Sequence, residues 1–230
     1  MKSSPLLISI TLSILALVVI QCSPIDPNSP VSKPNLNRLP DSRNPKQANA
    51  DRIEIQQVDR RILVDLQYTR PTGIAKFPLY DKKFPALLRP ETALRLKHAN
   101  AIVRKHGLRI KVWDAYRPQE AQIALWEASG KKAGYVADPY TKPSLHTKGV
   151  AVDVTLAYPD GTPVVMPTKF DDFSHKAAPS TFHPNPLVRR NLRILREVMT
   201  ESGFQHIRTE WWHFLDSNFE KYETIPKIDS

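Results

Sequence analysis

Two short stretches of the chain carry residue types that suit a catalytic zinc site. The first, SLHTKGVAVD, runs from Ser144 to Asp153 and contains His146, and the second, EWWH, runs from Glu210 to His213. A catalytic zinc needs three protein ligands, an open position for water and a carboxylate that moves protons. We therefore expect His146, Asp153 and His213 to bind one Zn²⁺ ion. Glu210 would then act on the water.

Of the two candidate metal ligands in the first stretch, Asp153 is indicated more strongly than His146. A histidine such as His146 is often only a surface or hydrogen-bonded residue. Asp153, in contrast, interrupts an apolar run that includes Val152 and Val154. A buried carboxylate requires a partner or a metal ion, so its place in this run favours a functional role.

The second stretch places a geometric condition on its two polar residues. Glu210 and His213 are three positions apart, and on a straight strand they would point to opposite faces. Joint action therefore requires a bulge, or a strand that begins after Glu210. Trp211 and Trp212 would form a dry, rigid wall. The alternative is that both tryptophans only pack and that Glu210 is a solvated edge charge.

Apolar periodicity and the positions of proline and glycine predict the elements that hold these residues. Proline favours the start of a helix and glycine its end, and alternation of apolar and polar residues indicates a strand. Helices are expected over 90–106, 118–129 and 187–202, and strands within 53–66 and over 108–113, 149–158, 164–166 and 209–215. This order predicts an α+β domain in which helices flank a central antiparallel sheet.

The chain before this domain has a different composition. Lys2 precedes an apolar run over 6–20, which is typical of a signal peptide and short for a membrane span, although a retained anchor is the alternative. Residues 23–50 contain six prolines among Ser, Asn and Asp and predict an extended linker. The expected organisation is thus a signal peptide over 1–22, a linker over 23–50 and a catalytic domain over 51–230, in a protein exported to the periplasm or cell envelope.

Cys22 is the only cysteine, so an intramolecular disulfide is excluded. Its sequence context, VIQC, resembles a bacterial lipoprotein signal, in which the cysteine is acylated and becomes the first residue. Gln21 departs from the small residue that is usual there. Lipid anchoring through Cys22 and plain cleavage are both kept as expectations.

The net charge of the chain excludes few classes of function. The chain has 33 basic and 23 acidic residues, a net charge of +10, without clustering of the basic residues or a nucleic-acid-binding motif. We therefore expect a solvated basic surface and no nucleic acid partner. The oligomeric state is not predicted.

The two stretches together resemble a known family. SxHxxGxAxD followed by ExWH is the paired motif of the zinc D-Ala-D-Ala peptidases, whose fold is shared with the Hedgehog signalling domain. The chain is most similar to the D-alanyl-D-alanine dipeptidases of the vancomycin-resistance (VanX) type. The likeness covers about 61–222 and includes four further segments, DLQY at 65–68, WDAYRP at 113–118, FDDF at 170–173 and ESGF at 201–204.

The resemblance implies a role for each matching residue. His146, Asp153 and His213 correspond to the zinc ligands, and Glu210 to the catalytic base. Arg117 corresponds to the arginine that stabilises the negative oxygen of the tetrahedral intermediate. Ser144 corresponds to a serine that binds substrate. Tyr68 and Asp171 correspond to the pair that receives the free ammonium group of the dipeptide.

The chain also departs from the family. Leu145 replaces a second serine, so one hydrogen bond to the substrate carboxylate is expected to be missing. The segment between Arg117 and His146 is shorter than in the resistance enzymes, which could widen the pocket. The expected function is hydrolysis of D-Ala-D-Ala to D-alanine in turnover of wall dipeptides. The alternatives are a D,D- or L,D-carboxypeptidase or endopeptidase acting on peptidoglycan stem peptides, and a non-catalytic zinc-holding module that binds the wall.

Overall fold

The computed structural model describes residues 51–222. The predicted signal peptide, the linker and Cys22 therefore lie outside the described residues. Within 51–222, no helix combines the length and the apolar character that a membrane crossing requires.

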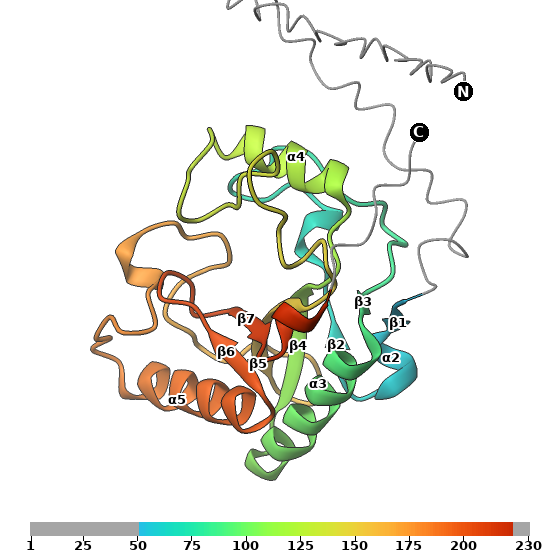
Figure 1. Ribbon diagram of the computed structural model, residues 1–230. Coiled ribbons are helices and arrows are strands. Elements are labelled where there is room, and N and C mark those ends of the chain that lie inside the picture. Colours follow the sequence, from blue (N-terminus) through green and yellow to red (C-terminus); the bar gives the residue numbers. More distant parts are fainter. Residues whose placement is uncertain (1–50, 223–230) are drawn as a thin grey trace, which may run out of the picture. The chain divides into compact units, whose positions relative to one another are not determined.

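A mixed five-stranded sheet forms the centre of the described domain (Figure 1). Its strands, in spatial order, are β2 (Leu63–Val64), β4 (Arg109–Asp114), β5 (Ala151–Ala157), β7 (His213–Asp216) and β6 (Phe204–His206). The pairing of β2 with β4 is parallel and the other three pairings are antiparallel. The predicted α+β class with a largely antiparallel central sheet is thus confirmed.

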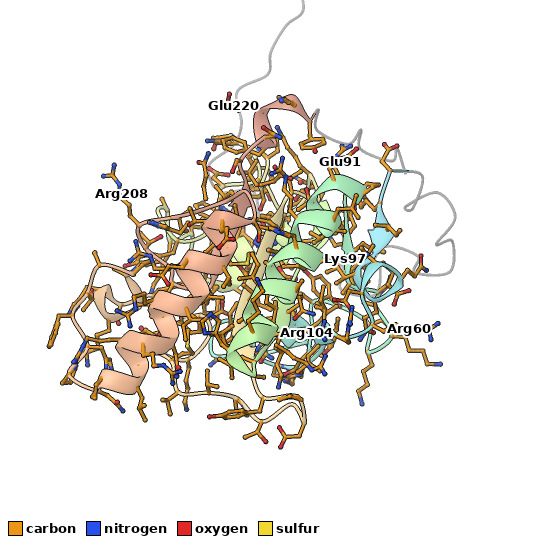
Figure 2. All side chains as sticks on the ribbon, turned by 90° about the horizontal axis from the view of Figure 1, so that it is seen from below. Arg60, Glu91, Lys97, Arg104, Arg208 and Glu220 are labelled. Carbon is orange, nitrogen blue, oxygen red and sulfur yellow. The ribbon has the colours of Figure 1, made fainter. Side chains whose placement is uncertain are left out.

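Two long helices cover one face of this sheet. Helix α3 (Pro90–Val103) and helix α5 (Pro186–Glu201) both carry proline at the first turn, and the Asn185 side chain caps α5 by accepting a hydrogen bond from the Leu187 amide at 2.9 Å. Figure 2 shows the two helices side by side over the strands. Their apolar faces and the β5 side chains Val152, Val154 and Leu156 belong to one buried core.

The third long helix, α4 (Gln119–Ala128), follows directly after Pro118 and lies at the top of Figure 1, away from α3 and α5. Short elements complete the described residues: β1 (Ile53–Glu54), α2 (Ile55–Val58), β3 (Leu87–Leu88), and the 3-10 turns Gln67–Thr69, Arg104–His106, His175–Ala177 and Phe219–Lys221. Strands β1 and β3 pair with each other, outside the main sheet.

The structure differs from the predicted elements in several places. The strand predicted over 209–215 begins only at His213. The segment over 55–58 was expected to be extended and is a helical turn. The return strand over 164–166 is reduced to a single bridge between Ala157 and Pro163, because proline has no amide hydrogen with which to extend a ladder. Strand β6 was not foreseen, because its short sequence FQH lacks apolar alternation.

A β-bulge in β4 changes the direction of one acidic side chain. Val112 pairs with Val154, but Asp114, two positions on, pairs with Asp153. The extra residue, Trp113, shifts the alternation by one. As a result Asp114 joins Asp153 on the face of the sheet that carries the predicted metal ligands.

A buried amide couples α3 to the sheet. The side chain of Asn100 accepts a hydrogen bond from the Ile110 amide at 3.0 Å and donates one to Asp59 Oδ2 at 3.0 Å. Asn100 is fully buried, and the Asp59 side chain is only 3% exposed. The variant Asn100→Ala leaves both partners buried without this contact and should lower the free energy of unfolding by about 2–4 kcal/mol.

Urea denaturation measures this loss, and Lys97→Ala on the exposed side of the same helix is the matched control. Lys97 is labelled in Figure 2 and should change stability by less than about 0.5 kcal/mol. A loss in Asn100→Ala no larger than that of the control would contradict the coupling.

Candidate active site

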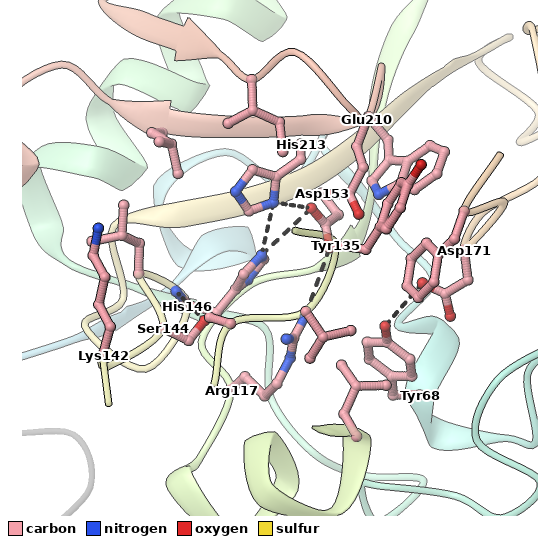
Figure 3. Close-up of a pocket in the computed structure, with 18 of the residues that line it drawn as sticks. Tyr68, Arg117, Tyr135, Lys142, Ser144, His146, Asp153, Asp171, Glu210 and His213 are labelled. Carbon is pink, nitrogen blue, oxygen red and sulfur yellow. Dashed lines mark hydrogen bonds and ion pairs between the residues drawn. The ribbon is translucent and has the colours of Figure 1, made fainter. Parts of the chain in front are cut away.

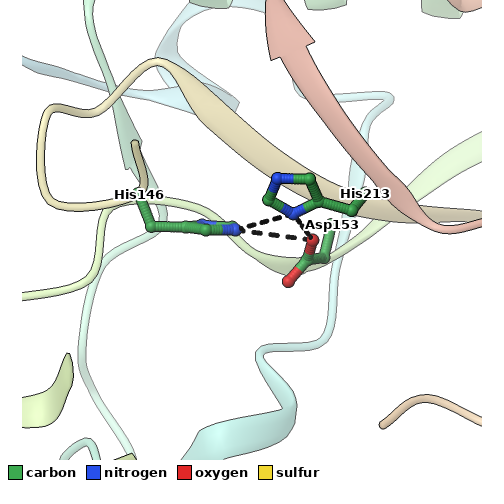
Figure 4. Close-up of side chains that lie close together, drawn as sticks. All are labelled: His146, Asp153 and His213. Carbon is green, nitrogen blue, oxygen red and sulfur yellow. Dashed lines mark hydrogen bonds and ion pairs between the residues drawn. The ribbon is translucent and has the colours of Figure 1, made fainter. Parts of the chain in front are cut away.

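Three predicted metal ligands converge from three places in the chain. Asp153 lies in β5, His213 is directly opposite it at the start of β7, and His146 comes from the turn before β5. Asp153 Oδ1 is 2.8 Å from His213 Nδ1 and 3.4 Å from His146 Nε2, and the two nitrogens are 3.1 Å apart (Figure 4).

These separations match a metal site. Tetrahedral zinc with bonds of about 2.0–2.1 Å holds its ligand atoms about 3.3 Å apart. Two imidazoles and a carboxylate are a donor set that zinc accepts, and three protein ligands leave one coordination position open. The residues present therefore fit a bound metal ion.

The backbone orients His146 for this role. Its Nδ1 is 2.7 Å from the carbonyl oxygen of Ala115, which can only accept a hydrogen bond. Nδ1 therefore carries the proton, and Nε2 presents its lone pair toward Asp153 and His213. The His146 side chain is 3% exposed, so the ring has little freedom to turn away.

Glu210 enters the same cavity from the segment that precedes β7. Because β7 begins only at His213, the strand rule that would separate these two side chains does not apply. This is the second of the two geometries that the sequence allowed. Figure 3 shows the Glu210 carboxylate pointing into the cavity beside Asp153. Burial, together with the charges of Asp153 and Asp171, raises the pKa of Glu210.

The two tryptophans between Glu210 and His213 are both buried. Trp211 donates its indole N–H to Thr168 Oγ1 at 2.9 Å and packs edge-on against Trp212. Trp212 also lines the cavity. Both rings therefore pack the core, and Trp212 also walls the cavity. The alternative, in which the rings only pack and Glu210 is a solvated edge charge, is wrong because Glu210 is buried in the cavity wall.

Arg117 is fixed beside the predicted metal ligands by a buried carboxylate that was not predicted from the sequence. Asp114 Oδ2 accepts hydrogen bonds from Arg117 Nη2 at 2.6 Å and Nε at 3.0 Å, and Gln122 accepts one from Nη1 at 2.7 Å. Arg117 Nη2 also lies 3.9 Å from Asp153 Oδ2. Guanidinium has five N–H donors, so donors remain for a ligand in the cavity.

Asp114 also touches other parts of the site. It accepts a hydrogen bond from the Tyr80 hydroxyl at 2.8 Å and lies 3.5 Å from His146 Nδ1. An acidic residue at the end of an apolar strand, within the WDAYRP segment, was the available signal. Its direction depends on the β4 bulge, which a sequence pattern does not reveal.

Tyr68 and Asp171 meet at the other end of the cavity. The Tyr68 hydroxyl donates to Asp171 Oδ1 at 3.0 Å, and Asp171 Oδ2 is buried with no hydrogen-bond partner among the described residues. Burial raises the pKa of Asp171 to about 7, although the Tyr68 hydrogen bond opposes this effect. An unpartnered buried carboxylate oxygen is a strong acceptor site for a cationic ligand.

One cavity of about 210 Å³ unites all these groups. Its wall contains all eight predicted site residues, namely Tyr68, Arg117, Ser144, His146, Asp153, Asp171, Glu210 and His213. The volume lies below the roughly 300–1,000 Å³ that drug-sized ligands occupy. The structure thus brings the predicted residues together around space for a small molecule.

Comparison with known proteins gives matches over most of the chain. Residues 48–227 match the family described as D-ala-D-ala dipeptidase. A D-alanyl-D-alanine dipeptidase from Escherichia coli K12 is 34% identical over 153 residues, covering 66% of this chain and 77% of that protein. A D-alanyl-D-alanine dipeptidase from Enterococcus faecalis is 30% identical over 143 residues, covering 53% and 69%.

A solved structure of the LdcB LD-carboxypeptidase also matches, with a TM-score of 0.43 and 16% identity over 73% of this chain and 68% of that one. At that TM-score the likeness is too distant to bear on this chain.

The raised pKa of Asp171 predicts a pH-dependent loss of stability in metal-free protein. The unfolded carboxyl group titrates near 3.8 and the folded one near 7, so the folded protein retains a proton that the unfolded chain releases. The stabilisation of the folded protein by this retained proton is complete below pH 3.8 and is lost as the pH rises through 7. Relative to Asp171→Asn, the wild type should lose about 1–3 kcal/mol of unfolding free energy between pH 4 and pH 8.

Urea denaturation in the presence of a chelator measures the difference at each pH. Asparagine suits this position because Asp171 has a φ of 59°, a left-handed conformation that asparagine tolerates. A stability difference that does not change with pH would show that Asp171 ionises in the folded protein as it does in the unfolded chain.

Proposed function

The chain belongs to the D-Ala-D-Ala dipeptidase family of metallopeptidases, and from this premise we propose that it uses one Zn²⁺ ion to hydrolyse D-Ala-D-Ala to two molecules of D-alanine. His146, Asp153 and His213 would hold the ion. The single observation that carries the choice of a dipeptide is the unpartnered, buried Oδ2 of Asp171 in the wall of a cavity of about 210 Å³.

The Asp171 oxygen explains why a dipeptide fits better than a longer peptide. The free ammonium group of D-Ala-D-Ala can pair with Asp171, whereas an acylated amine has no charge to offer and carries an additional group. Aromatic rings lie behind the cavity wall on either side of Asp171 in sequence and in space: Tyr68 and Trp212 line the cavity, and Phe170 packs against both from behind. The ring centroid of Phe170 is 5.4 Å from that of Tyr68 and 5.6 Å from that of Trp212.

The residues of the chain can carry the hydrolysis as follows. A zinc ion at this site would supply Lewis acidity, which activates water and polarises the peptide carbonyl. Glu210 accepts the proton that the attacking water loses, and its raised pKa suits it to hold that proton. Glu210 then delivers the proton to the leaving amine as the carbon–nitrogen bond breaks.

Arg117 supplies positive charge where the carbonyl oxygen becomes negative. Its position does not depend on substrate, because Asp114 and Gln122 already hold the guanidinium group. Ser144 lies in the wall nearest His146, where its hydroxyl can donate to the substrate. The arrangement therefore has separate groups for the amine, the reacting carbonyl and the leaving half of the dipeptide.

We further propose that the enzyme acts outside the cytoplasm, in turnover of wall-derived dipeptides. This setting is supported by the signal-peptide pattern over 1–22, and Cys22 remains a candidate for lipid attachment. Destruction of a cytoplasmic precursor pool, as antibiotic resistance requires, would not fit an exported enzyme.

Replacement of the general base is the first test. Glu210→Gln keeps the size of the side chain but cannot accept the proton, so kcat for D-Ala-D-Ala should fall by roughly 10²–10⁴-fold. Zinc content, measured by mass spectrometry of the folded protein, should stay at one ion per chain. Glu220→Gln, on the exposed surface, is the matched control and should keep full activity. Full activity in Glu210→Gln would refute the assigned role.

Blocking the amine tests the substrate class. Wild type should cleave D-Ala-D-Ala at least roughly 100-fold more efficiently, in kcat/KM, than N-acetyl-D-Ala-D-Ala, because the acylated substrate leaves Asp171 unpaired. Asp171→Asn should reduce this ratio chiefly by weakening the reaction of the free dipeptide. Equal turnover of both substrates by wild type would instead favour a carboxypeptidase that acts on stem peptides.

A further inference from the structure

Lys142 places a positive charge at the opposite end of the cavity from Asp171. It lies in the cavity wall close to Ser144 in sequence, and its side chain is exposed to solvent. In Figure 3, Lys142 and Asp171 lie on opposite sides of the His146, Asp153 and His213 cluster. One end of the cavity therefore carries an acidic residue, Asp171, and the other end a positively charged residue, Lys142.

The charge of Lys142 is available to a ligand. Within 51–222, no carboxylate lies within ion-pair distance of its ammonium group. The other permanently charged cation of the cavity wall, Arg117, is already engaged by Asp114 and lies 3.9 Å from Asp153. Of the described cavity residues, Lys142 is thus the cation whose charge is not already balanced.

The neighbouring wall offers little else for an anion. The Leu145 side chain is apolar and cannot donate a hydrogen bond, and the Ser144 side-chain oxygen already accepts one from the His146 amide at 3.3 Å. If Lys142 did not contribute, a substrate carboxylate at this end of the cavity would depend on one neutral side-chain donor, the Ser144 hydroxyl. A carboxylate taken from water needs more compensation than one neutral hydrogen bond provides.

The backbone of Lys142 is held even though its side chain is exposed. The Lys142 amide donates to the Asp138 carbonyl at 3.0 Å, and Gln122 donates to the Ala137 carbonyl at 2.7 Å. In the same loop, Tyr135 stacks on Phe173 with ring centroids 4.9 Å apart. The stem of Lys142 thus starts from a fixed point at the rim of the cavity.

From this charge distribution we propose that Lys142 binds the C-terminal carboxylate of the substrate and so favours substrates whose C-terminus is free. The inference rests on the proposed function, because it takes the amine end of the substrate to lie at Asp171. With the scissile carbonyl between the metal ligands and Arg117, the C-terminal residue must extend toward Ser144 and Lys142. An endopeptidase, whose substrates have no carboxylate at this point, has no use for such a charge.

The test compares D-Ala-D-Ala with its C-terminal amide. Lys142→Met retains most of the aliphatic stem and removes the charge. It should raise KM for the free acid roughly 10-fold at low salt, with kcat little changed, because the carboxylate is bound equally in the ground and transition states. Turnover of the amide should not change. Lys142→Arg should restore most of the loss, and added salt should reduce it.

Lys131→Met is the matched control, since Lys131 begins the same loop but pairs with Glu127 at 3.6 Å. It should leave the kinetics of both substrates unchanged. Equal losses on the acid and the amide in Lys142→Met would mean that the lysine only supports the loop, and unchanged kinetics would mean that it is merely solvated. Either result overturns the inference while leaving the dipeptidase proposal in place. Failure of the wild type to cleave D-Ala-D-Ala would instead overturn the proposed function, and this inference with it.

Discussion

The antiparallel pairing of β5 with β7 is the constraint on which the rest of the site depends. It sets Asp153 opposite His213 across two central strands, and the Val154 amide extends the contact to the Trp212 carbonyl at 2.9 Å. The same hydrogen bonds that build the core therefore fix two of the three predicted metal ligands. They also hold the segment before His213, from which Glu210 enters the cavity.

Charge compensation organises the groups around this pairing. Asp114 neutralises Arg117 and lies beside His146, while Asp153 is surrounded by the two histidines. Burial alone would raise the pKa of Asp153, but His146 and His213 hold it below its ordinary value. Three acidic or basic residues of the cavity wall stand outside these pairs: Glu210, which is the proposed base, and Asp171 and Lys142, which lie on opposite sides of the predicted metal ligands. A zwitterionic dipeptide carries the complementary charges at its own two ends.

The sequence could predict the donors of the site because their types are rare in apolar surroundings, as with Asp153 in a strand of valines. It could also predict the long helices, since Pro90 begins the first, apolar residues from Leu187 to Met199 mark the second, and Gly107 and Gly203 follow their ends. It could not predict the β4 bulge, because an inserted residue leaves the apolar pattern nearly intact while reversing the side chains beyond it. For that reason the sequence did not reveal that the Asp114 side chain points into the site and holds Arg117.

The placement of two ligands on core strands has an evolutionary consequence. A slip of β7 by one residue would bring Phe214 to the metal face and turn His213 toward the core, so the ligand set and the packing would fail together. Selection for thermodynamic stability therefore preserves this strand register, and with it the positions from which the two side chains project, even during periods when the activity is not required. A lineage that relaxes its need for the enzyme should retain these strands longest and lose the loop residues, such as Lys142, first.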